Sequence, residues 1–314
     1  MTLMLVSPRQ IRQLALSILA AAVGYFLFAL WGGWRDVVAA IGAVGAGGVV
    51  VALLLSLVNY GLRFTRWQLY LRRLGLELAW QPSLRIYLTG FALTTTPGKA
   101  GEMLRGLFLK QHGLSYSRGV AAFVSERLSD LLAIVLLTLL GLSVLPNGQS
   151  FIGIGAAVVI GGVLVMVYGG TRPNPQLEIH TGRLARGIRH VREMLNEARL
   201  CHSPRLLVIS TLLSLIAWSA EAWAFYLILS WIGFETALAF AFSVYALAML
   251  AGALSFLPGG LGGAEAVMTG LLIWAGMDSP QAIAATVITR LATLWFAVLL
   301  GIIALGMRST STPE

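Results

Sequence analysis

Long apolar stretches, separated by short polar segments, make up most of the chain. Six of them hold about 20 predominantly apolar residues, the length that an α-helix needs to cross the hydrocarbon core of a bilayer. These predicted spans are 11–31, 37–60, 120–143, 151–169, 206–231 and 281–306. Two arginines precede the first span and no small-residue cleavage site follows it, so we expect an uncleaved helix rather than a signal peptide.

Two further apolar segments are each interrupted near the middle by a Pro-Gly pair. The breaks are Pro97-Gly98 in segment 83–111 and Pro258-Gly259 in segment 237–276. Arms of about 13 residues reach roughly 20 Å, which does not cross a core of about 30 Å. The pattern therefore predicts an all-α polytopic membrane protein with six spanning helices and two re-entrant helical hairpins, although the arm 237–257 is long enough either to span or to re-enter.

The two halves of the chain resemble each other. The matched features are Arg127 with Arg290 and Glu102 with Glu265 at a shift of 163 residues, Gly98 with Gly259 at 161, and LLSLVNY (54–60) with LLSLIAW (212–218) at 158. These concordant shifts predict repeats over approximately 11–143 and 151–306 within a single transmembrane domain, 1–314. Because an odd number of predicted spans separates the hairpins, they enter from opposite sides and the repeats are inverted.

Lysine and arginine residues are distributed unevenly about the predicted spans. Seventeen of the 22, including Arg63 and Arg66, lie at one face, and only Arg35 lies at the other. The remaining four, which fall inside apolar segments, are Lys99, Arg105, Arg127 and Arg290. Since cytoplasmic loops are enriched in positive charge, we expect a multi-pass protein of the cytoplasmic (inner) membrane with both termini in the cytoplasm.

The longest polar segment, 170–205, carries a helical stripe of apolar residues bordered by arginines. We expect a cytoplasmic amphipathic helix that lies on the inner leaflet. Specific binding of anionic lipid headgroups is one interpretation of its charge, and an ordinary positively charged cytoplasmic loop is the other.

Composition and charge exclude several classes of protein. A chain that is 58% hydrophobic and 11% charged belongs with membrane proteins, and its formal charge of +9 is typical of cytoplasmic loops rather than of nucleic-acid binding. One cysteine excludes an internal disulfide framework, and the histidines show no ligand-like spacing, so we expect no metal site and no cofactor. The segment PGGLGG at 258–263 follows no strand and lacks the ending of a nucleotide-binding loop.

Each repeat contributes a Pro-Gly break, a glutamate just after it, and an arginine on the following helix. Ionisable residues at membrane depth are costly, and they normally face a bundle interior or a water-filled cavity. The candidate substrate-binding residues are Arg127, Arg290, Lys99, Glu102, Arg105, Glu265, Asp130, Gly98 and Gly259. The arginines suit a phosphate group, because the planar guanidinium donates two parallel hydrogen bonds and stays charged.

The carboxylates allow other interpretations. Glu102 and Glu265 can cap or latch the broken helices through structural ion pairs, orient the arginines, accept a hydroxyl or amine of a headgroup, or carry a proton. Glu221 and Asn59 lie in apolar helices, where they either line the same cavity or form hydrogen bonds between helices.

These features resemble the signatures of a known family. The similar motifs are Pro97-Gly98, Gly101-Glu102, Arg105, Glu126-Arg127, LPGGLGG with Glu265, and RLATLW at 290–295. They look like those of the lysylphosphatidylglycerol synthase transmembrane region family, also described as flippase-like membrane proteins, over roughly residues 10 to 306. The resemblance implies a multi-span fold with re-entrant helices and a role in handling an anionic lipid. We expect no soluble synthase domain, so synthase activity is not carried over.

The leading hypothesis is a translocase that moves an anionic lipid, such as a phospholipid derivative or a polyprenyl-phosphate-linked glycolipid, across the membrane. Arg127 and Arg290 are expected to bind its phosphate, with Lys99 and Arg105 assisting. One alternative is a membrane-embedded lipid-modifying transferase, in which deep carboxylates act as base or metal ligands. Another is a scaffold for a cell-envelope biosynthesis enzyme. The expected partners are the anionic lipid and either a second copy of the chain or such an enzyme.

Overall fold

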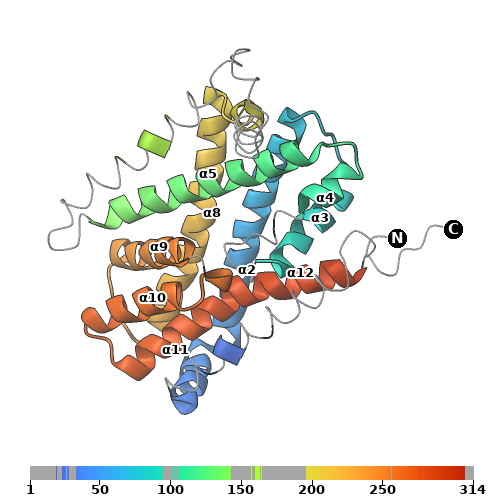
Figure 1. Ribbon diagram of the computed structural model, residues 1–314. Helices are drawn as coiled ribbons and strands as arrows, with labels where there is room; N and C mark the ends of the chain where they lie inside the picture. Colours follow the sequence, from blue (N-terminus) through green and yellow to red (C-terminus); the bar gives the residue numbers. More distant parts are fainter. Residues whose placement is uncertain are drawn as a thin grey trace, which may run out of the picture.

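The structure is a computed structural model that describes residues 33–94, 102, 105–142, 196–255 and 257–307, together with residues 19, 23–25, 27, 157, 160–162 and 164. Every element within these residues is helical (Figure 1). The elements are α2 (Trp34–Arg73), α3 (Trp80–Ala92), α4 (Arg105–Lys110), α5 (Tyr116–Leu142), α8 (Pro204–Trp231), α9 (Leu238–Leu254), the 3₁₀ turn η4 (Pro258–Gly260), α10 (Gly263–Trp274), α11 (Ser279–Arg290), the π-helical turn η5 (Leu291–Trp295) and α12 (Phe296–Met307).

Three helices in the described part of the chain are long and apolar enough to cross a membrane. They are Trp34–Arg73, Pro204–Trp231 and Ser279–Met307. Each covers one predicted span, and α5 coincides with another, 120–143. The predicted spans 11–31 and 151–169 lie mostly outside the described residues, as does most of the predicted amphipathic segment 170–205. An all-helical membrane protein is therefore confirmed, while the number of spans stays a prediction.

Helix α2 extends well beyond its predicted end at residue 60. It continues to Arg73, with a break in its regular geometry at Gly45, where φ is 66° and ψ is 168°. Arg63 and Arg66, which the sequence assigns to the positively charged face, are both buried on this helix. Hydropathy falls after residue 60 because the buried face of the helix becomes polar there, whereas the helix itself does not end.

The segment 237–276 forms a pair of helices that pack against each other, α9 and α10, joined through η4. The joint requires glycine, because Gly259, Gly260 and Gly262 have φ values of 65°, 70° and 86°. A Cβ atom on Gly260 would lie 3.0 Å from the backbone of Gly252, so the joint also brings two stretches of backbone close together. In the first half α3 and α4 are in contact, and residues 95–101 between them lie outside the described part.

The packing of the helices follows a pattern of exchanged partners. Helix α3 packs on α12 while α9 packs on α5, and α4 packs on α5 while α10 packs on α11. Helices α2 and α8, which carry the matched segments 54–60 and 212–218, cross side by side (Figure 1). Helix α3 and its counterpart α9 each pack on a helix of the other half, whereas α4 and α10 each pack on the next long helix of their own half. A duplicated chain would produce both matched sets of contacts; the inverted repeat itself stays a prediction.

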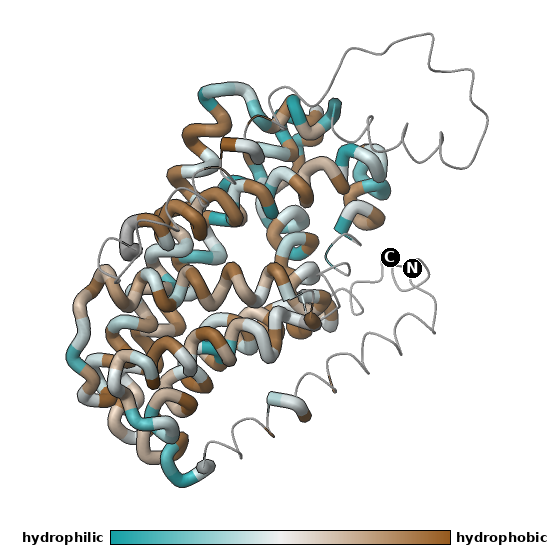
Figure 2. The backbone as a smooth tube through the Cα atoms, turned by 60° about the vertical axis from the view of Figure 1, so that its left-hand side comes forward, coloured by the Kyte–Doolittle hydropathy of each residue, from teal (hydrophilic) through white to brown (hydrophobic). Residues whose placement is uncertain are grey.

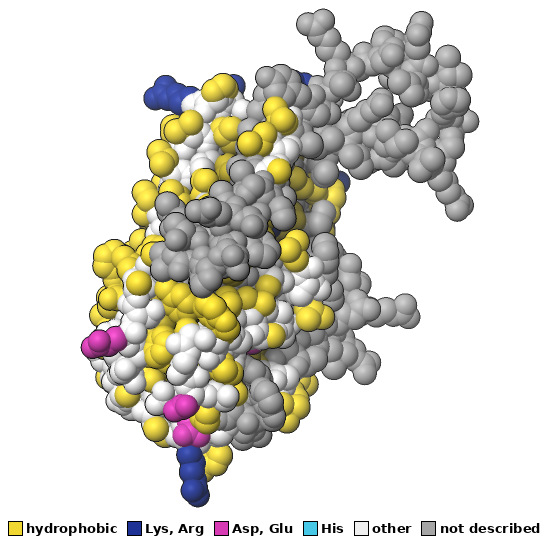
Figure 3. Space-filling model, turned by 90° about the vertical axis from the view of Figure 1, so that its left-hand side faces the viewer, with side chains coloured by type: hydrophobic (Ala, Val, Ile, Leu, Met, Phe, Trp, Pro, Cys, Tyr) yellow, Lys and Arg dark blue, Asp and Glu magenta, His cyan; other side chains and the backbone are white. Residues whose placement is uncertain are grey.

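Large apolar side chains cover much of the outer surface of the long helices. Exposed examples are Val50, Leu54 and Leu57 on α2, Leu212 and Ile216 on α8, and Leu299 and Ile302 on α12. Figure 2 shows hydrophobic residues along most of the helix lengths. On the face drawn in Figure 3, hydrophobic side chains gather between charged ones at the upper end and in the lower half. Exposed apolar area of this extent suits a lipid environment rather than water.

Candidate functional site

A cavity of about 380 Å³ lies where α2, α5, α8, α9 and α11 meet. One part of its wall is charged and aromatic, and the other is apolar. The charged lining residues are Arg63, Glu102, Arg127, Asp130, Glu221 and Arg290; aromatic ones are Tyr60, Phe91, Trp218 and Tyr245; and apolar ones include Leu131, Ile134, Met249, Leu250, Leu254, Leu257 and Leu294. Residues distant in the sequence thus converge on one space inside the helix bundle.

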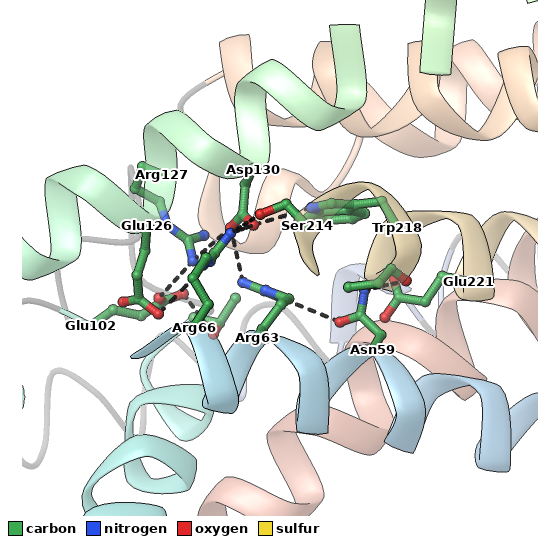
Figure 4. Close-up of polar contacts among 12 residues, drawn as sticks. Asn59, Arg63, Arg66, Glu102, Glu126, Arg127, Asp130, Ser214, Trp218 and Glu221 are labelled. Atoms are coloured by element: carbon green, nitrogen blue, oxygen red, sulfur yellow. Dashed lines mark hydrogen bonds and ion pairs between the residues drawn. The ribbon is translucent and has the colours of Figure 1, made fainter. Parts of the chain in front are cut away.

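Asp130 on α5 is surrounded by arginines. Its Oδ1 accepts hydrogen bonds from Arg66 Nη1 at 2.7 Å and from Trp218 Nε1 at 3.1 Å. Its Oδ2 lies 3.1 Å from Arg63 Nη2 and 3.0 Å from Arg127 Nη2. Figure 4 shows these side chains pointing toward one another from α2, α5 and α8. One carboxylate therefore holds three guanidinium groups from two helices in place.

Two glutamates extend the network. Glu126 Oε2 accepts a hydrogen bond of 2.7 Å from Arg105 Nη2, and its Oε1 lies 3.9 Å from Arg66 Nη2. Glu102 Oε2 lies 3.5 Å from Arg105 Nη2 and 3.8 Å from Arg127 Nη2. Together with Asp130, four arginines face three carboxylates, which leaves one positive charge in excess in this cluster.

Arg105 is fixed by aromatic rings as well as by charge. Its guanidinium carbon lies 4.6 Å from the ring centroid of Trp67 and 5.4 Å from that of Tyr87, distances at which cation–π attraction operates. Gly90 leaves the necessary room, since a Cβ atom there would lie 2.5 Å from Arg105 Cδ. Arg105 is not among the described residues that line the cavity, so it supports the charged wall from behind.

The second half of the chain contains a smaller charged group. Arg290 Nε donates to Glu265 Oε1 at 2.7 Å, its Nη2 donates to the carbonyl oxygen of Gly259 at 2.9 Å, and its Nη1 lies 3.7 Å from Met249 Sδ. The second oxygen of Glu265 accepts the backbone N–H of Gly262 at 2.7 Å and so caps the start of α10. These contacts tie the Pro-Gly joint to helix α11.

The two arginines that the repeat matches have different surroundings. Each meets the glutamate of its own half, but the Arg127 side chain is 23% exposed and that of Arg290 is only 5% exposed. Arg127 Nε has no hydrogen-bond partner among the described residues. Arg290 uses all three of its nitrogens on the protein. Of the pair, both of which line the cavity, Arg127 has the more accessible side chain.

Glu221 on α8 lies apart from the arginine network. Its Oε2 accepts a hydrogen bond of 2.6 Å from the hydroxyl of Tyr245. Nearby, Asn59 donates from Nδ2 to the carbonyl oxygen of Ala217 at 2.8 Å, and its Oδ1 lies 3.5 Å from Arg63 Nη1. Glu221 lines the cavity, whereas Asn59 forms a hydrogen bond between helices α2 and α8.

The structure brings most of the predicted site residues together. Glu102, Arg127 and Asp130 line the cavity together with Gly259 and Arg290, while Arg105 and Glu265 hold lining residues in place. Lys99 and Gly98 lie outside the described residues. In the described residues, no group of three or more His, Cys, Asp or Glu side chains is arranged to hold a metal ion.

Sequence reasoning missed several residues of the site. They are Arg63, Arg66 and Trp218, which contact Asp130, and Tyr245, which contacts Glu221. A signal was present on α2, because Asn59, Arg63 and Arg66 recur at helical spacing and so share one face.

A helical membrane protein with a charged cavity buried among its helices is the class that this fold and site define. Residues 13–301 match the family described as the lysylphosphatidylglycerol synthase TM region, and the chain belongs to that family. It is similar to a UPF0104 membrane protein of Methanothermobacter thermautotrophicus, with 24% identity over 93% of this chain and 92% of the relative. A UPF0104 membrane protein of Pyrococcus horikoshii is 21% identical over 81% of this chain and 84% of its own length. The resemblance noted in the sequence is thereby confirmed.

Proposed function

We propose that this protein is a lipid translocase that moves an anionic lipid, a phospholipid derivative or a polyprenyl-phosphate-linked glycolipid, across the cytoplasmic membrane. The observation that carries the proposal is the cavity in which an arginine-rich wall adjoins an apolar wall. A lipid presents the same two chemistries, since its phosphate is anionic and the start of its chains is apolar. The protein binds and moves the lipid without altering a covalent bond.

The charge of the wall favours an anion. The cluster of Arg63, Arg66, Arg105 and Arg127 with Glu102, Glu126 and Asp130 has one more arginine than carboxylate, and its members Arg63 and Arg127 line the cavity beside Glu102 and Asp130. Guanidinium groups held by Asp130 are preorganised, so a phosphate gains ion pairs without ordering two long side chains.

The size of the cavity limits what enters it. A volume of about 380 Å³ falls at the low end of the range of small-molecule pockets. It accommodates a compact headgroup but not two long chains. Residues such as Leu254 and Leu257 continue the apolar wall to positions that are 64% and 47% exposed. The lipid chains are therefore expected to leave along this wall toward the bilayer.

The proposed architecture is the one that the sequence predicts. Six spans and two re-entrant hairpins form inverted repeats, with both termini in the cytoplasm. The exchanged packing of α3 on α12 and α9 on α5 supports this arrangement, as does the occurrence of a glutamate–arginine contact in each half. In such transporters the substrate site lies near the midplane, between the broken helices.

Reconstitution into liposomes tests the function. Vesicles carry fluorescent phosphatidylglycerol, phosphatidylethanolamine or a short polyprenyl phosphate, and dithionite reports the fraction of label in the outer leaflet over time. We expect faster transbilayer movement of an anionic lipid with the wild-type protein and at least a tenfold loss with Arg63→Ala/Arg127→Ala. The matched control is Arg118→Ala, an exposed arginine outside the cavity. Equal rates in wild type and the double variant would refute the proposal.

A further inference from the structure

Glu221 differs from the other carboxylates of the cavity. Glu102 and Asp130 each contact at least two arginines, whereas the ion pairs found among the described residues include none to Glu221. The residue is only 4% exposed, and its observed partner is the neutral hydroxyl of Tyr245 at 2.6 Å. Burying a carboxylate without a cationic partner costs free energy. If Glu221 is ionised, its negative charge must therefore be stabilised by other charged groups of the site.

The charge balance of the described part of the site supplies that stabilisation. The buried or cavity-lining arginines in the described part of the chain are Arg63, Arg66, Arg105, Arg127 and Arg290. The matching carboxylates are Glu102, Glu126, Asp130, Glu265 and Glu221. Five positive charges meet five negative charges when Glu221 is ionised. When Glu221 is protonated, these ten described residues carry one positive charge in sum.

An anion that enters the cavity changes this balance. With Glu221 ionised, a bound phosphate monoanion gives the site a net negative charge in a poorly solvated space, which is unfavourable. With Glu221 protonated, the same anion brings the net charge to zero. We propose that Glu221 is a proton-binding site, and that binding of one phosphate or phosphodiester monoanion at Arg63 and Arg127 takes up one proton there. This inference rests on the proposed function, and it adds that a proton binds together with the anionic lipid.

The surroundings of Glu221 permit the reaction. The charged and titratable groups that act on it are Tyr60 and Arg63 from α2, Asp130 from α5, Tyr245 from α9 and Arg290 from α11. Tyr245 donates to Oε2, so a proton from solvent can add to Oε1 without displacing that bond. The carboxylate becomes a carboxylic acid as the anion binds, and it returns the proton when the anion leaves. Figure 4 shows Asn59, which accepts a hydrogen bond from Arg63, lying between Arg63 and Glu221.

Isothermal titration calorimetry on the full-length protein in phosphatidylcholine nanodiscs tests the inference. The probes are dioctanoyl phosphatidylglycerol and dimethyl phosphate, phosphodiesters whose charge is constant between pH 5.5 and 8.5. Titration in two buffers of different ionisation enthalpy gives the number of protons taken up. For wild type we expect uptake approaching one proton per anion, with an affinity that falls by up to tenfold per pH unit where free Glu221 is ionised. If phosphatidylglycerol binds with proton uptake and dimethyl phosphate does not bind, the ligand is a lipid headgroup rather than a free phosphodiester. That result supports the coupling of anion binding to proton uptake as much as binding of both probes does.

Variants separate this inference from the proposed function. Glu221→Gln mimics the protonated acid, so we expect anion binding that no longer depends on pH and proton uptake near zero. Glu197→Gln, which removes a carboxylate outside the cavity, is expected to behave as wild type. If Glu221→Gln does not fold, Glu221→Asp keeps the carboxyl group and is expected to retain proton uptake at a shifted pH. Anion binding without proton uptake, or unchanged uptake in Glu221→Gln, overturns the proton site alone; no anion binding at any pH overturns the proposed function with it.

Discussion

Arg290 and Glu265 are joined by a contact of 2.7 Å between Nε and Oε1, whereas their counterparts Arg127 and Glu102 approach to only 3.8 Å. The first pair is almost completely buried, and Arg290 also donates to the backbone of Gly259. The second pair borders the cavity, and Arg127 shares its charge between Glu102 and Asp130. Both matched arginines line the cavity, but Arg290 also holds the helix joint, whereas the Arg127 side chain is the more exposed.

The different surroundings of Arg290 and Arg127 predict that replacing each of them with alanine has a different effect. Arg290→Ala leaves Glu265 buried without a cation, which is expected to cost about 3–5 kcal/mol of stability. Arg127→Ala is expected to cost less, because Arg63 and Arg66 still neutralise Asp130, but it is expected to abolish most anion binding. Thermal unfolding in detergent micelles measures the first effect, and anion titration measures the second. Equal losses of stability in the two variants would contradict this prediction.

Asp130 is predicted to be the residue on which the charged wall most depends. Asp130→Asn leaves three guanidinium groups facing one another without their shared carboxylate, and we expect a loss of at least about 3 kcal/mol. Adding Arg63→Met removes one of the repelling charges. The double variant is then expected to be more stable than the sum of the single effects predicts. Additive effects in thermal unfolding would show that the arginines do not act through Asp130.

Packing of α12 on α3 is predicted to depend on Gly301. A Cβ atom there would lie 2.8 Å from the carbonyl carbon of Phe91 and 2.9 Å from the carbonyl oxygen of Leu88. Gly301→Val is therefore expected to destabilise the fold by about 1–3 kcal/mol through overpacking. For Gly306→Ala, in the same helix, the new methyl group has no neighbour within 4 Å among the described residues, so the variant is expected to be neutral or slightly stabilising. The melting temperatures of both variants check this prediction.

Cys201 is predicted to resist alkylation in the folded protein. The residue lies in the turn before α8, and burial raises the pKa of its thiol from 9.0 to about 12. At pH 8 the reactive thiolate is then about a thousandfold rarer than for an unperturbed thiol. Iodoacetamide labelling followed by mass spectrometry measures the rate. The comparison is Leu200→Cys in a Cys201→Ser background, which places a thiol at a position that is 40% exposed.

The raised pKa of the Cys201 thiol also affects the stability of the folded protein at alkaline pH. Because the folded state binds the thiol proton more tightly than the unfolded chain does, this contribution to stability is complete below pH 9 and is lost as the pH rises toward 12. Cys201→Ser is expected to lack this part of the alkaline destabilisation. A pH series of melting temperatures for both proteins makes the comparison, and identical alkaline slopes would argue against a raised pKa.

Local features of the site were predictable from the sequence. The joint at Pro258-Gly259 follows from residue types, since glycine alone adopts positive φ without strain. A latching role at the joint was one of the interpretations offered for Glu265, whereas Arg290, which holds the joint through Glu265 and the carbonyl oxygen of Gly259, was predicted to bind phosphate. Each of these inferences needs only neighbouring residues or a comparison of the chain with itself.

The arginines of α2 could not be assigned in the same way. Hydropathy treats a polar residue after an apolar run as the start of a loop, although in a helix that continues it lies on a buried face. Helical spacing places Asn59, Arg63 and Arg66 on one side of α2. Which carboxylate they meet depends on how α2 crosses α5, and that crossing is set by side-chain packing along both helices.

The π-helical turn Leu291–Trp295 changes the rotational phase of the helix that carries Arg290. Gly301 follows Arg290 by 11 residues, or about three α-helical turns, which would place both on one side of an uninterrupted helix. A π turn takes about one residue more, and so rotates the later part by roughly 100°. Arg290 can therefore face the cavity while Gly301 lies against the backbone of α3. Helix α5 is α-helical throughout Tyr116–Leu142, so the two matched helices, although alike in sequence, differ in which face their second halves present.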